Sequence, residues 1–284
     1  MKPELTDSRR LTGANLFWDH PSAIIDLVAE GPLDAFIEAW QKAVRFLLDR
    51  VGHGGENTCF RLFEGGASLL ISAPVDVLYS MCELNEAAFS AASEGEPLSL
   101  PDLQEAAEAL KAAFAKESCP ELLALQAAAR ERDLPFLWDD DEVSIGFGQG
   151  VLVWPRDALP AVEGLDWSVF GSIPLALVTG TNGKSTTVRM TASIMAAAGH
   201  RAGLTSTDFI RVGGRTIDTG DYSGTGGARM LVRQPDVEMA VLEVARGGLL
   251  RRGLGVEHAQ TALVTNVASD HRGEYGINSV DGVS

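Results

Sequence analysis

The segment Leu175–Val188, LALVTGTNGKSTTV, constrains the fold of this chain more than any other part of the sequence. A short apolar run leads into a small turn with two glycines, followed by a lysine, a serine and a segment of helical composition. This order predicts a buried parallel strand, a tight loop and the first turn of a helix. Loop N–H groups and the helix dipole surround an anion, to which Lys184 adds a charge and Ser185 a hydroxyl that reaches Mg2+. We therefore expect a phosphate-binding loop, the alternative being an ordinary strand-to-helix turn.

A loop of this kind predicts a nucleoside triphosphate as ligand. Val178 stands where many kinases and motor ATPases have the first glycine of the loop. A GTPase is disfavoured because the guanine motif N-K-x-D is missing, and the nearest stretch, residues 266–270, reads NVASD. The residues expected to contact the phosphates are Gly180, Thr181, Asn182, Gly183, Lys184, Ser185 and Thr186.

Length, charge and apolar pattern limit the class of protein. With 284 residues the chain is long enough for two domains, each with its own core. The formal net charge of −16 argues against nucleic acid or an anionic membrane as the main partner. No apolar run approaches the ~20 residues of a membrane span, and no apolar signal core is found, so a cytoplasmic protein is expected. The separated Cys59, Cys82 and Cys119 are expected to be reduced thiols.

The first part of the chain, residues 1–160, is predicted to be a mixed α+β domain. An amphipathic helix is expected over residues 32–51 and a hairpin over 59–74. Three further helices are expected before short strands on either side of a turn at residues 139–141. The three aspartates of that turn are typical of a solvated turn, and a metal site is the weaker alternative. Residues 161–173 are predicted to be a linker.

Residues 174–284 are predicted to form a P-loop domain with a mostly parallel sheet, so the fold class is α/β. Strands are expected at 176–180, 202–210, 237–246 and 260–267, with a helix after the loop that Gly199 ends. Polar residues follow each apolar run, and the carboxyl ends of parallel strands meet at one edge, where α/β proteins bind ligands.

Three groups of residues beyond the loop are candidates for this edge. Glu243 ends an apolar run, where a metal-binding carboxylate is expected, although a strand-end salt bridge is the alternative. His271 follows the next run and is either a surface residue or a residue near a metal. Residues Thr205–Asp208 end a third run, so Ser206, Thr207 and Asp208 are candidates to contact substrate or simply to cap the strand. Arg246 is a candidate to bind an acidic substrate.

The motifs GTNGKST, LEVARGG and TNVASDH, in this order, resemble the central domain of the Mur ligase superfamily, which includes folylpolyglutamate synthetases and cyanophycin synthetases. The likeness is closest to cyanophycin synthetases, through GDYSGTGGAR in the second half and through RLTGANLFWDHPS and VSIGFGQG in the first. Their ATP-grasp domain has no counterpart here. The motifs LEVARGG and TNVASDH argue against a further hypothesis, an unrelated P-loop NTPase.

The resemblance implies an ATP-dependent ligase that joins a small-molecule or peptide-like carboxylate to an amino acid through an acyl phosphate, releasing ADP and phosphate. It implies that Lys184 stabilises phosphate charge, that Ser185 and Glu243 hold Mg2+, and that His271 ligates a second metal. Arg246 would steady the acyl phosphate. A homo-oligomer is compatible with the family.

Two departures from the family occur within this domain. Val244 replaces a threonine that is common in relatives, which removes one hydroxyl, and the sequence stops at Ser284, soon after His271. The early stop keeps a second hypothesis open. The Mur-like domain is therefore expected to be truncated. The alternative to a ligase is a non-catalytic nucleotide-binding or interaction protein derived from one.

Overall fold

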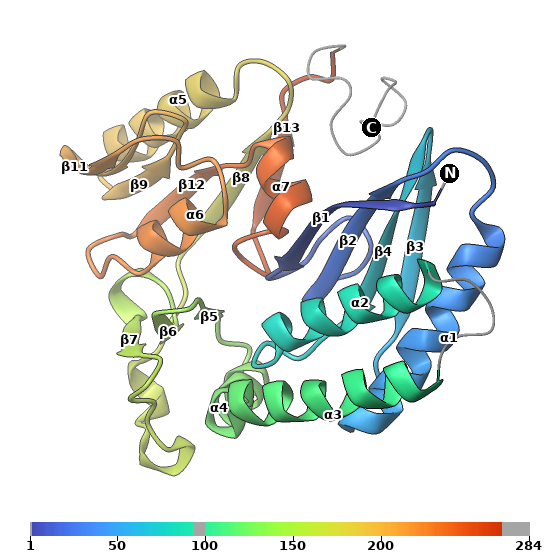
Figure 1. The fold of residues 1–284 in the computed structure, drawn as a ribbon. Helices are drawn as coiled ribbons and strands as arrows, with labels where there is room; N and C mark the ends of the chain where they lie inside the picture. Colours follow the sequence, from blue (N-terminus) through green and yellow to red (C-terminus); the bar gives the residue numbers. More distant parts are fainter. Residues whose placement is uncertain (1, 94–99, 269–284) are drawn as a thin grey trace. The chain divides into compact units, whose positions relative to one another are not determined.

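The structure is a computed structural model that describes residues 2–93 and 100–268. Its contacts divide the chain into two compact units (Figure 1). One unit consists of residues up to Thr12 together with Phe17–Pro120, and the other contains Gly13–Leu16 and the described residues from Glu121 onward. The division of the chain into a domain (1–160), a linker (161–173) and a second domain (174–284) stays a prediction. By contacts, residues 121–160 group with the second unit.

The first unit is an antiparallel sheet with helices packed on it. The sheet order is β1-β2-β4-β3, and helix α2 lies against β1, β2 and β4, while α1 and α3 pack on α2. The predicted amphipathic helix and the predicted hairpin β3–β4 are confirmed; β1 and β2 were not predicted. The elements are β1 (Glu4–Leu11), β2 (Ser22–Val28), α1 (Asp34–Val51), β3 (Thr58–Phe63), β4 (Gly66–Ser72), α2 (Leu78–Ser93) and α3 (Leu100–Glu117).

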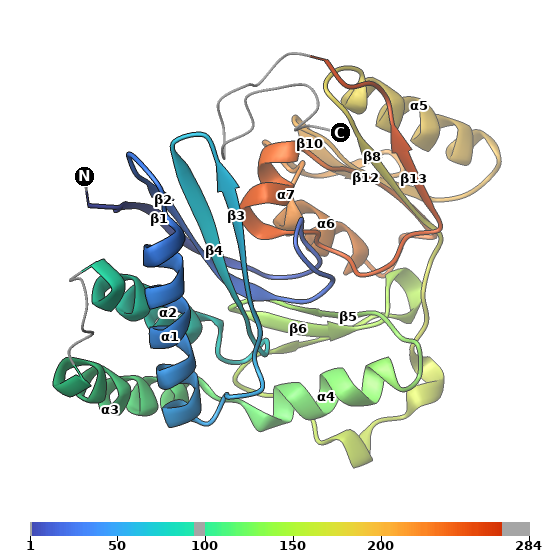
Figure 2. The ribbon, with the colours of Figure 1, turned by 90° about the vertical axis from the view of Figure 1, so that its right-hand side faces the viewer.

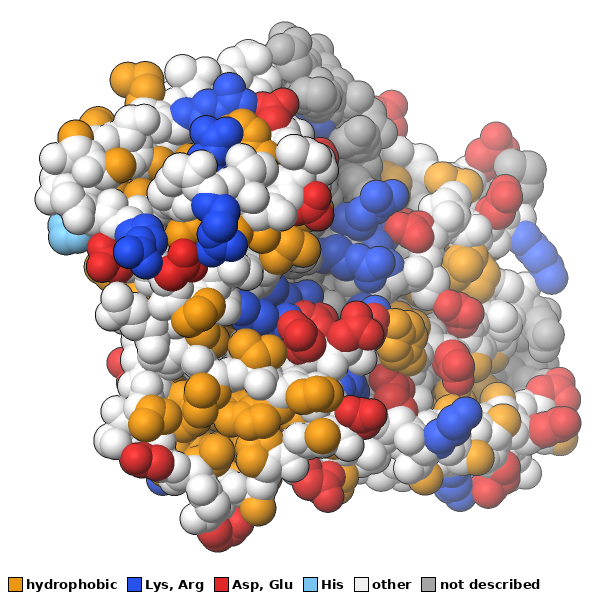
Figure 3. Space-filling model, turned by 90° about the vertical axis from the view of Figure 1, so that its left-hand side faces the viewer, with side chains coloured by type: hydrophobic (Ala, Val, Ile, Leu, Met, Phe, Trp, Pro, Cys, Tyr) orange, Lys and Arg blue, Asp and Glu red, His pale blue; other side chains and the backbone are white. Residues whose placement is uncertain are grey.

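A small sheet and a helix begin the second unit. Asp139 accepts hydrogen bonds from the backbone N–H groups of Asp141 and Glu142, at 3.1 and 2.8 Å, so the aspartate run is the turn that its composition predicts. Hydrophobic side chains gather at the surface over β7 and the segment after it, where Leu152 and Val169 are exposed (Figure 3). The elements are α4 (Pro120–Arg130), β5 (Phe136–Trp138), β6 (Glu142–Ile145) and β7 (Leu152–Pro155), followed by short 3-10 turns.

The main sheet of the second unit confirms the α/β fold class. Its order is β11-β10-β9-β12-β8-β13, in which β9, β12, β8 and β13 run parallel and β10 and β11 form an antiparallel hairpin at one edge. The elements are β8 (Leu175–Thr179), α5 (Lys184–Ala197), β9 (Ala202–Thr205), β10 (Phe209–Val212), β11 (Arg215–Thr219), α6 (Thr225–Val232), β12 (Met239–Glu243), α7 (Arg246–Arg252) and β13 (Thr261–Val264).

Both faces of this sheet are covered, which explains the continuous apolar strands. In β12, Val241 packs on the α5 side with Val188, whereas Ala240 and Leu242 pack on the α6 side with Leu231. Figure 2 shows α5 on one side of the sheet and α6 on the other. A parallel strand buried on both faces is apolar at successive positions rather than at alternate ones.

The prediction of one strand over residues 202–210 is wrong. The strand ends at Thr205, and the chain turns back at Phe209 to form β10. The Ser206 hydroxyl accepts the backbone N–H groups of Asp208 and Phe209, at 3.2 and 3.3 Å. A serine side chain that binds its own neighbouring backbone competes with the strand ladder, and this produces the turn. No helix in the described ranges is long and apolar enough to cross a bilayer.

Candidate functional site

The loop between β8 and α5, predicted to bind phosphate, is a tight turn that depends on glycine. Gly180 and Gly183 adopt φ values of 130° and 82°, in the region that favours glycine. Lys184 is the first residue of α5, and its ammonium group donates hydrogen bonds to the carbonyl oxygens of Gly180, at 2.9 Å, and Thr181, at 3.1 Å. The ammonium group of Lys184 therefore lies against the backbone of its own loop.

Two residues after β13 hold this loop, and sequence reasoning did not select them. The Thr265 hydroxyl donates to the carbonyl of Asn182 at 2.7 Å. The Asn266 side chain accepts the N–H of Asn182 at 3.1 Å and donates to its carbonyl at 3.0 Å. The backbone carbonyl of Asn266 accepts the N–H of Thr181 at 2.9 Å. The available signal was the polar pair at the end of a parallel strand adjacent to β8.

Contact with these residues also explains Gly180. A Cβ atom at this position would lie 2.2 Å from the Thr265 hydroxyl oxygen and 2.9 Å from the carbonyl oxygen of Asn266. Position 180 therefore requires glycine for two reasons, its positive φ angle and the close approach of the chain after β13.

Glu243 ends β12, the strand between β8 and β9, and is only 2% exposed. The Ser185 hydroxyl donates to its Oε1 atom at 3.2 Å and lies 3.3 Å from the hydroxyl of Thr207. The Glu243 backbone N–H donates to the Thr205 hydroxyl at 3.1 Å. Its second carboxylate oxygen, Oε2, is buried and has no hydrogen-bond partner among the residues that the structure describes.

These groups fit Mg2+ better than they fit a purely structural role. A buried carboxylate oxygen without a partner is costly, and a hard cation that prefers oxygen ligands removes that cost. Mg2+ usually takes one or two protein oxygens and completes its shell with water and phosphate oxygens, so Glu243 and Ser185 suffice. Within the described ranges, no cluster of three or more His, Cys, Asp and Glu side chains offers an all-protein metal site. His271, predicted to be near a metal, lies outside the described residues.

The three candidates after β9 have different surroundings. Ser206 is buried and its hydroxyl is occupied by the turn. Asp208 is exposed and pairs with Arg189 of α5. Thr207 is exposed beside Ser185, so of the three it is the one that faces the loop. Thr186 is exposed in the first turn of α5.

Arg246 is the first residue of α7 and follows Glu243, the last residue of β12, by three positions. Ala245, the residue before it, donates its backbone N–H to the carbonyl of Ser223 at 2.9 Å. Ser223 belongs to the loop GDYSGTGGAR, and its hydroxyl donates to Asp221 at 2.7 Å. The hydrogen bond between Ala245 and Ser223 joins the glycine-rich loop to the segment that follows Glu243.

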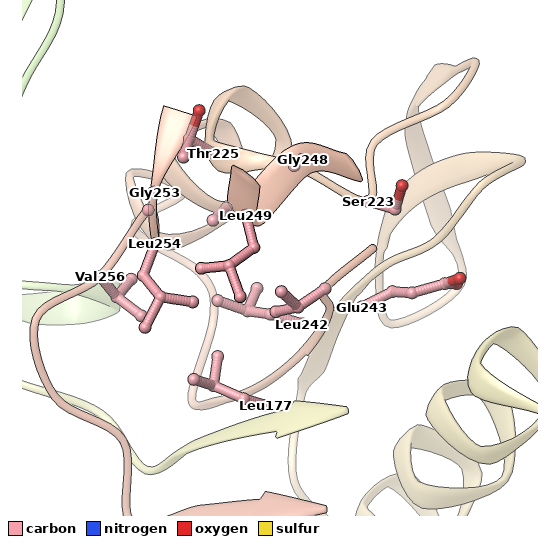
Figure 4. Close-up of a pocket in the computed structure, with 14 residues that line it drawn as sticks. Leu177, Ser223, Thr225, Leu242, Glu243, Gly248, Leu249, Gly253, Leu254 and Val256 are labelled. Carbon is pink, nitrogen blue, oxygen red and sulfur yellow. The ribbon is translucent and has the colours of Figure 1, made fainter. Parts of the chain in front are cut away.

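A narrow cavity of about 10 Å3 lies between α6, α7 and the end of β12. In Figure 4, Leu177, Leu242, Leu249, Leu254 and Val256 point toward one another, whereas the ends of the Ser223 and Glu243 side chains lie away from this apolar group. The cavity has room for about one water molecule, so it is packing space beneath the site rather than a nucleotide pocket. A larger cavity, of about 260 Å3, is lined by Phe136 and Ile173 at the opposite, amino-terminal edge of the strands, and no predicted site residue lines it.

The glycine-containing loop after β8, the helix that starts at its lysine and the carboxylate at the end of the neighbouring strand define an α/β domain of the P-loop type. Residues 178–279 match the Mur ligase middle domain, so this part of the chain is similar to the central domain of the Mur ligase superfamily.

Three curated relatives illustrate the range of the likeness. The chain is 47% identical to cyanophycin synthetase of Trichormus variabilis over 111 residues, 39% of this chain and 12% of that protein. It is 34% identical to dihydrofolate synthase/folylpolyglutamate synthase of Escherichia coli over 121 residues, 33% and 28% of the two chains. It is 32% identical to UDP-N-acetylmuramyl-tripeptide synthetase of Leifsonia xyli subsp. xyli over 126 residues, 43% and 24% of the two chains. The chain thus spans between 12 and 28% of the length of these relatives.

Proposed function

We propose that this chain is the nucleotide-binding part of an ATP-dependent ligase of the Mur type, which joins a carboxylic acid to an amino acid. In this proposal residues 174–284 form the ATP-binding domain, residues 1–160 an accessory domain, and the protein acts in the cytoplasm. The observation that carries the proposal is the buried, unpartnered Oε2 atom of Glu243 beside Ser185 and the loop. The relatives, named as synthetases and synthases, supply the reaction class.

In the first step the carboxylate oxygen of the acid attacks the γ-phosphorus of ATP, and ADP leaves. The loop N–H groups and Lys184 stabilise the negative charge on the β- and γ-phosphate oxygens. Lys184 must exchange its bonds to Gly180 and Thr181 for bonds to phosphate. Ser185 and Glu243 would hold Mg2+, which neutralises charge as the phosphoryl group moves.

In the second step the amine attacks the carbonyl carbon of the acyl phosphate, the bond from that carbon to the phosphate oxygen breaks, and the proton that the amine loses leaves with inorganic phosphate. Arg246, at the start of α7, is proposed to orient the anionic acyl phosphate. Thr207, which faces Ser185, is proposed to contact the acid. His271 is proposed to ligate a second metal. A small or peptide-like carboxylate and an amino acid are the proposed substrates.

The test is titration of the protein with Mg-ATP in a calorimeter, for the wild type and for Lys184→Ala. We expect binding by the wild type and a loss of at least tenfold in the variant, because a charge that contacts phosphate is removed. Lys111→Ala, at an exposed ion pair with Glu108, is the matched control and should bind normally. Amino-acid-dependent phosphate release then distinguishes a ligase from a protein that only binds nucleotide. Absence of wild-type binding would contradict the proposal.

A further inference from the structure

The motif RLTGANLFWDHPS is not explained by the proposed reaction, yet part of it contacts the P-loop domain. Gly13–Leu16, within the connection from β1 to β2, groups by contacts with the second unit. The carbonyl oxygen of Ala14 accepts the backbone N–H of Leu254, two residues beyond the end of α7, at 2.7 Å. The Asn15 side chain donates to the carbonyl of Gly13 at 3.1 Å and helps to fix the local turn.

At this contact two backbones touch with no side chain between them. A Cβ atom on Gly13 would lie 2.4 Å from the carbonyl oxygen of Leu254. A Cβ atom on Gly253 would lie 2.8 Å from the carbonyl oxygen of Ala14 and 3.0 Å from that of Gly13. Gly253 has a φ of 81° and would favour glycine in any case, but the φ of Gly13 is not in the left-handed region. The close approach is therefore the reason that glycine is required at position 13.

Helix α7 depends on such contacts for its position. It has seven residues, which is too short to be stable in isolation. Its start is tied to Ser223 through the N–H of Ala245, and Gly248 lies close to Gly224, where a Cβ atom would come within 3.3 Å of the Gly224 Cα. Its end is held by the contact with Gly13 and Ala14. A displacement at one end of so short a helix moves the other end, which carries Arg246.

We propose that Gly13–Leu16 is a positioning element for the ligase site, which acts by fixing the end of α7 and thereby the place of Arg246. The inference rests on the proposed function. Gly13 is the positioning residue, since it allows the close approach and does not itself lie at the loop. The nucleotide loop is held by the residues after β13, and so its affinity for Mg-ATP is independent of this contact.

The test compares Gly13→Ala and Gly253→Ala, which open the contact from opposite sides. Gly55→Ala, with open space around the added Cβ and an ordinary φ, is the control for the first variant. Gly52→Ala, at another helix C-cap with a φ of 85° and open space, is the control for the strain in the second. Asn15→Ala adds no atom to the contact and serves as a milder variant if Gly13→Ala fails to fold.

Hydrogen exchange provides a readout that does not need activity. We expect the amide of Leu254 and those of α7 to exchange about tenfold faster or more in both contact variants than in their controls, because the local opening free energy falls. The double variant should be no worse than the worse single one, since both open the same contact. Unchanged exchange in Gly13→Ala would overturn the proposal.

The catalytic readouts separate positioning from mere packing. We expect the Mg-ATP dissociation constant of Gly13→Ala to stay within about twofold of the control. We expect kcat for amide formation to fall about 10- to 100-fold, because small misplacements of catalytic groups lower the rate by such factors. Faster exchange of α7 with unchanged kcat and KM would overturn the positioning role. If the wild type binds no Mg-ATP, the proposed function fails and the role of α7 with it; if it binds and turns over, only Gly13–Leu16 is under test.

Discussion

The site is unusual at the scale of single residues because it contains a buried carboxylate that the described protein only half satisfies. Ser185 bonds one oxygen of Glu243, and the other oxygen has no partner among the described residues. An unpartnered buried carboxylate oxygen destabilises the unliganded fold, and the proposed Mg2+ would remove that cost. Replacing the Glu243 carboxylate by a neutral group should therefore raise the stability of the unliganded protein and lower its affinity for Mg-ATP.

Glu243→Gln should show this opposition. We expect the free energy of unfolding without ligand to rise by about 1 to 3 kcal/mol, because a neutral amide replaces an unpaired buried charge. The increase in Tm that Mg-ATP produces should become smaller, because a metal ligand is lost. Thermal unfolding with and without Mg-ATP measures both effects, and Glu257→Gln, at an exposed glutamate, is the control. A full Mg-ATP effect in Glu243→Gln would rule out this carboxylate as the ligand.

Asn266→Ala should weaken nucleotide binding. In the proposed site the Asn266 side chain does not contact the nucleotide but holds the loop that does. The substitution removes two hydrogen bonds to the backbone of Asn182. We expect a cost of about 1 to 2 kcal/mol, or about 5- to 30-fold in the Mg-ATP dissociation constant. Calorimetry checks this value against Thr261→Ala, an exposed residue at the start of the same strand. Equal affinities in the two variants would mean that the loop needs no support from β13.

At the scale of elements, the small sheet β5-β6-β7 is tied to the end of α6 by one side chain. Arg233 donates to the Asp139 carboxylate at 2.6 Å, to the Glu142 carboxylate at 3.1 Å and to the Ser144 hydroxyl at 3.1 Å. Burial raises the pKa of Asp139, but the Arg233 guanidinium and the backbone N–H of Glu142 outweigh it and hold the pKa below its usual 3.8. The carboxylate form is therefore the one that stabilises the fold.

The sign of the pH dependence follows from that lowered pKa. The stabilisation is present above the unfolded value of about 3.8 and is lost as the pH falls through the lower folded value. Arg233→Met should reduce the free energy of unfolding at pH 7 by about 2 to 3 kcal/mol and flatten its dependence on pH below 4. Denaturant titrations between pH 2.5 and 7, in which Arg215→Met serves as an exposed ion-pair control, measure both. A parallel pH dependence in wild type and variant would contradict this account.

Elements whose signal is local can be predicted from the sequence, whereas elements that depend on distant partners cannot. Leu175–Val188 specifies strand, loop and helix through its own glycines and apolar run, and the structure has them there. The short hairpin β10–β11 and helix α7 were not predicted, since they are held by contacts such as Ala245 with Ser223 rather than by a periodic pattern. The role of Thr265 and Asn266 was missed for the same reason. Their partner, Asn182, is more than 80 residues away.

At the scale of the whole molecule, each of the two units has a buried core. In the first, the Trp40 indole donates to the Asn85 side chain at 2.9 Å, and Asn85 donates to the carbonyl of Leu69 at 3.1 Å, so a hydrogen-bonded pair joins both helices to the sheet. In the second, apolar clusters lie on both faces of the main sheet. Separate cores of this kind predict separable unfolding.

We expect calorimetric unfolding to contain two transitions, of which Mg-ATP raises one. Asn85→Ala should lower the other, because the buried Trp40 N–H loses its partner at a cost of about 1 to 3 kcal/mol. Scanning calorimetry of wild type and variant, with and without Mg-ATP, checks the assignment. A single transition that moves as a whole under both changes would mean that the units unfold cooperatively.

Helix α5 begins at the loop, but the support of that loop comes from Thr265 and Asn266 just after β13, which is the border strand of the main sheet within the part of the chain that the structure describes. The side chains of β13 are exposed, including Leu263 and Val264. Among the described residues β13 is paired on one side only, and a strand paired on one side opens more readily than a central strand, so the order of the loop after β8 depends on how firmly β13 is held. Affinity for nucleotide can therefore be adjusted from outside the pocket: any substitution or contact that stiffens β13 also stiffens Thr265 and Asn266, and reduces the entropy that the loop loses when phosphate binds.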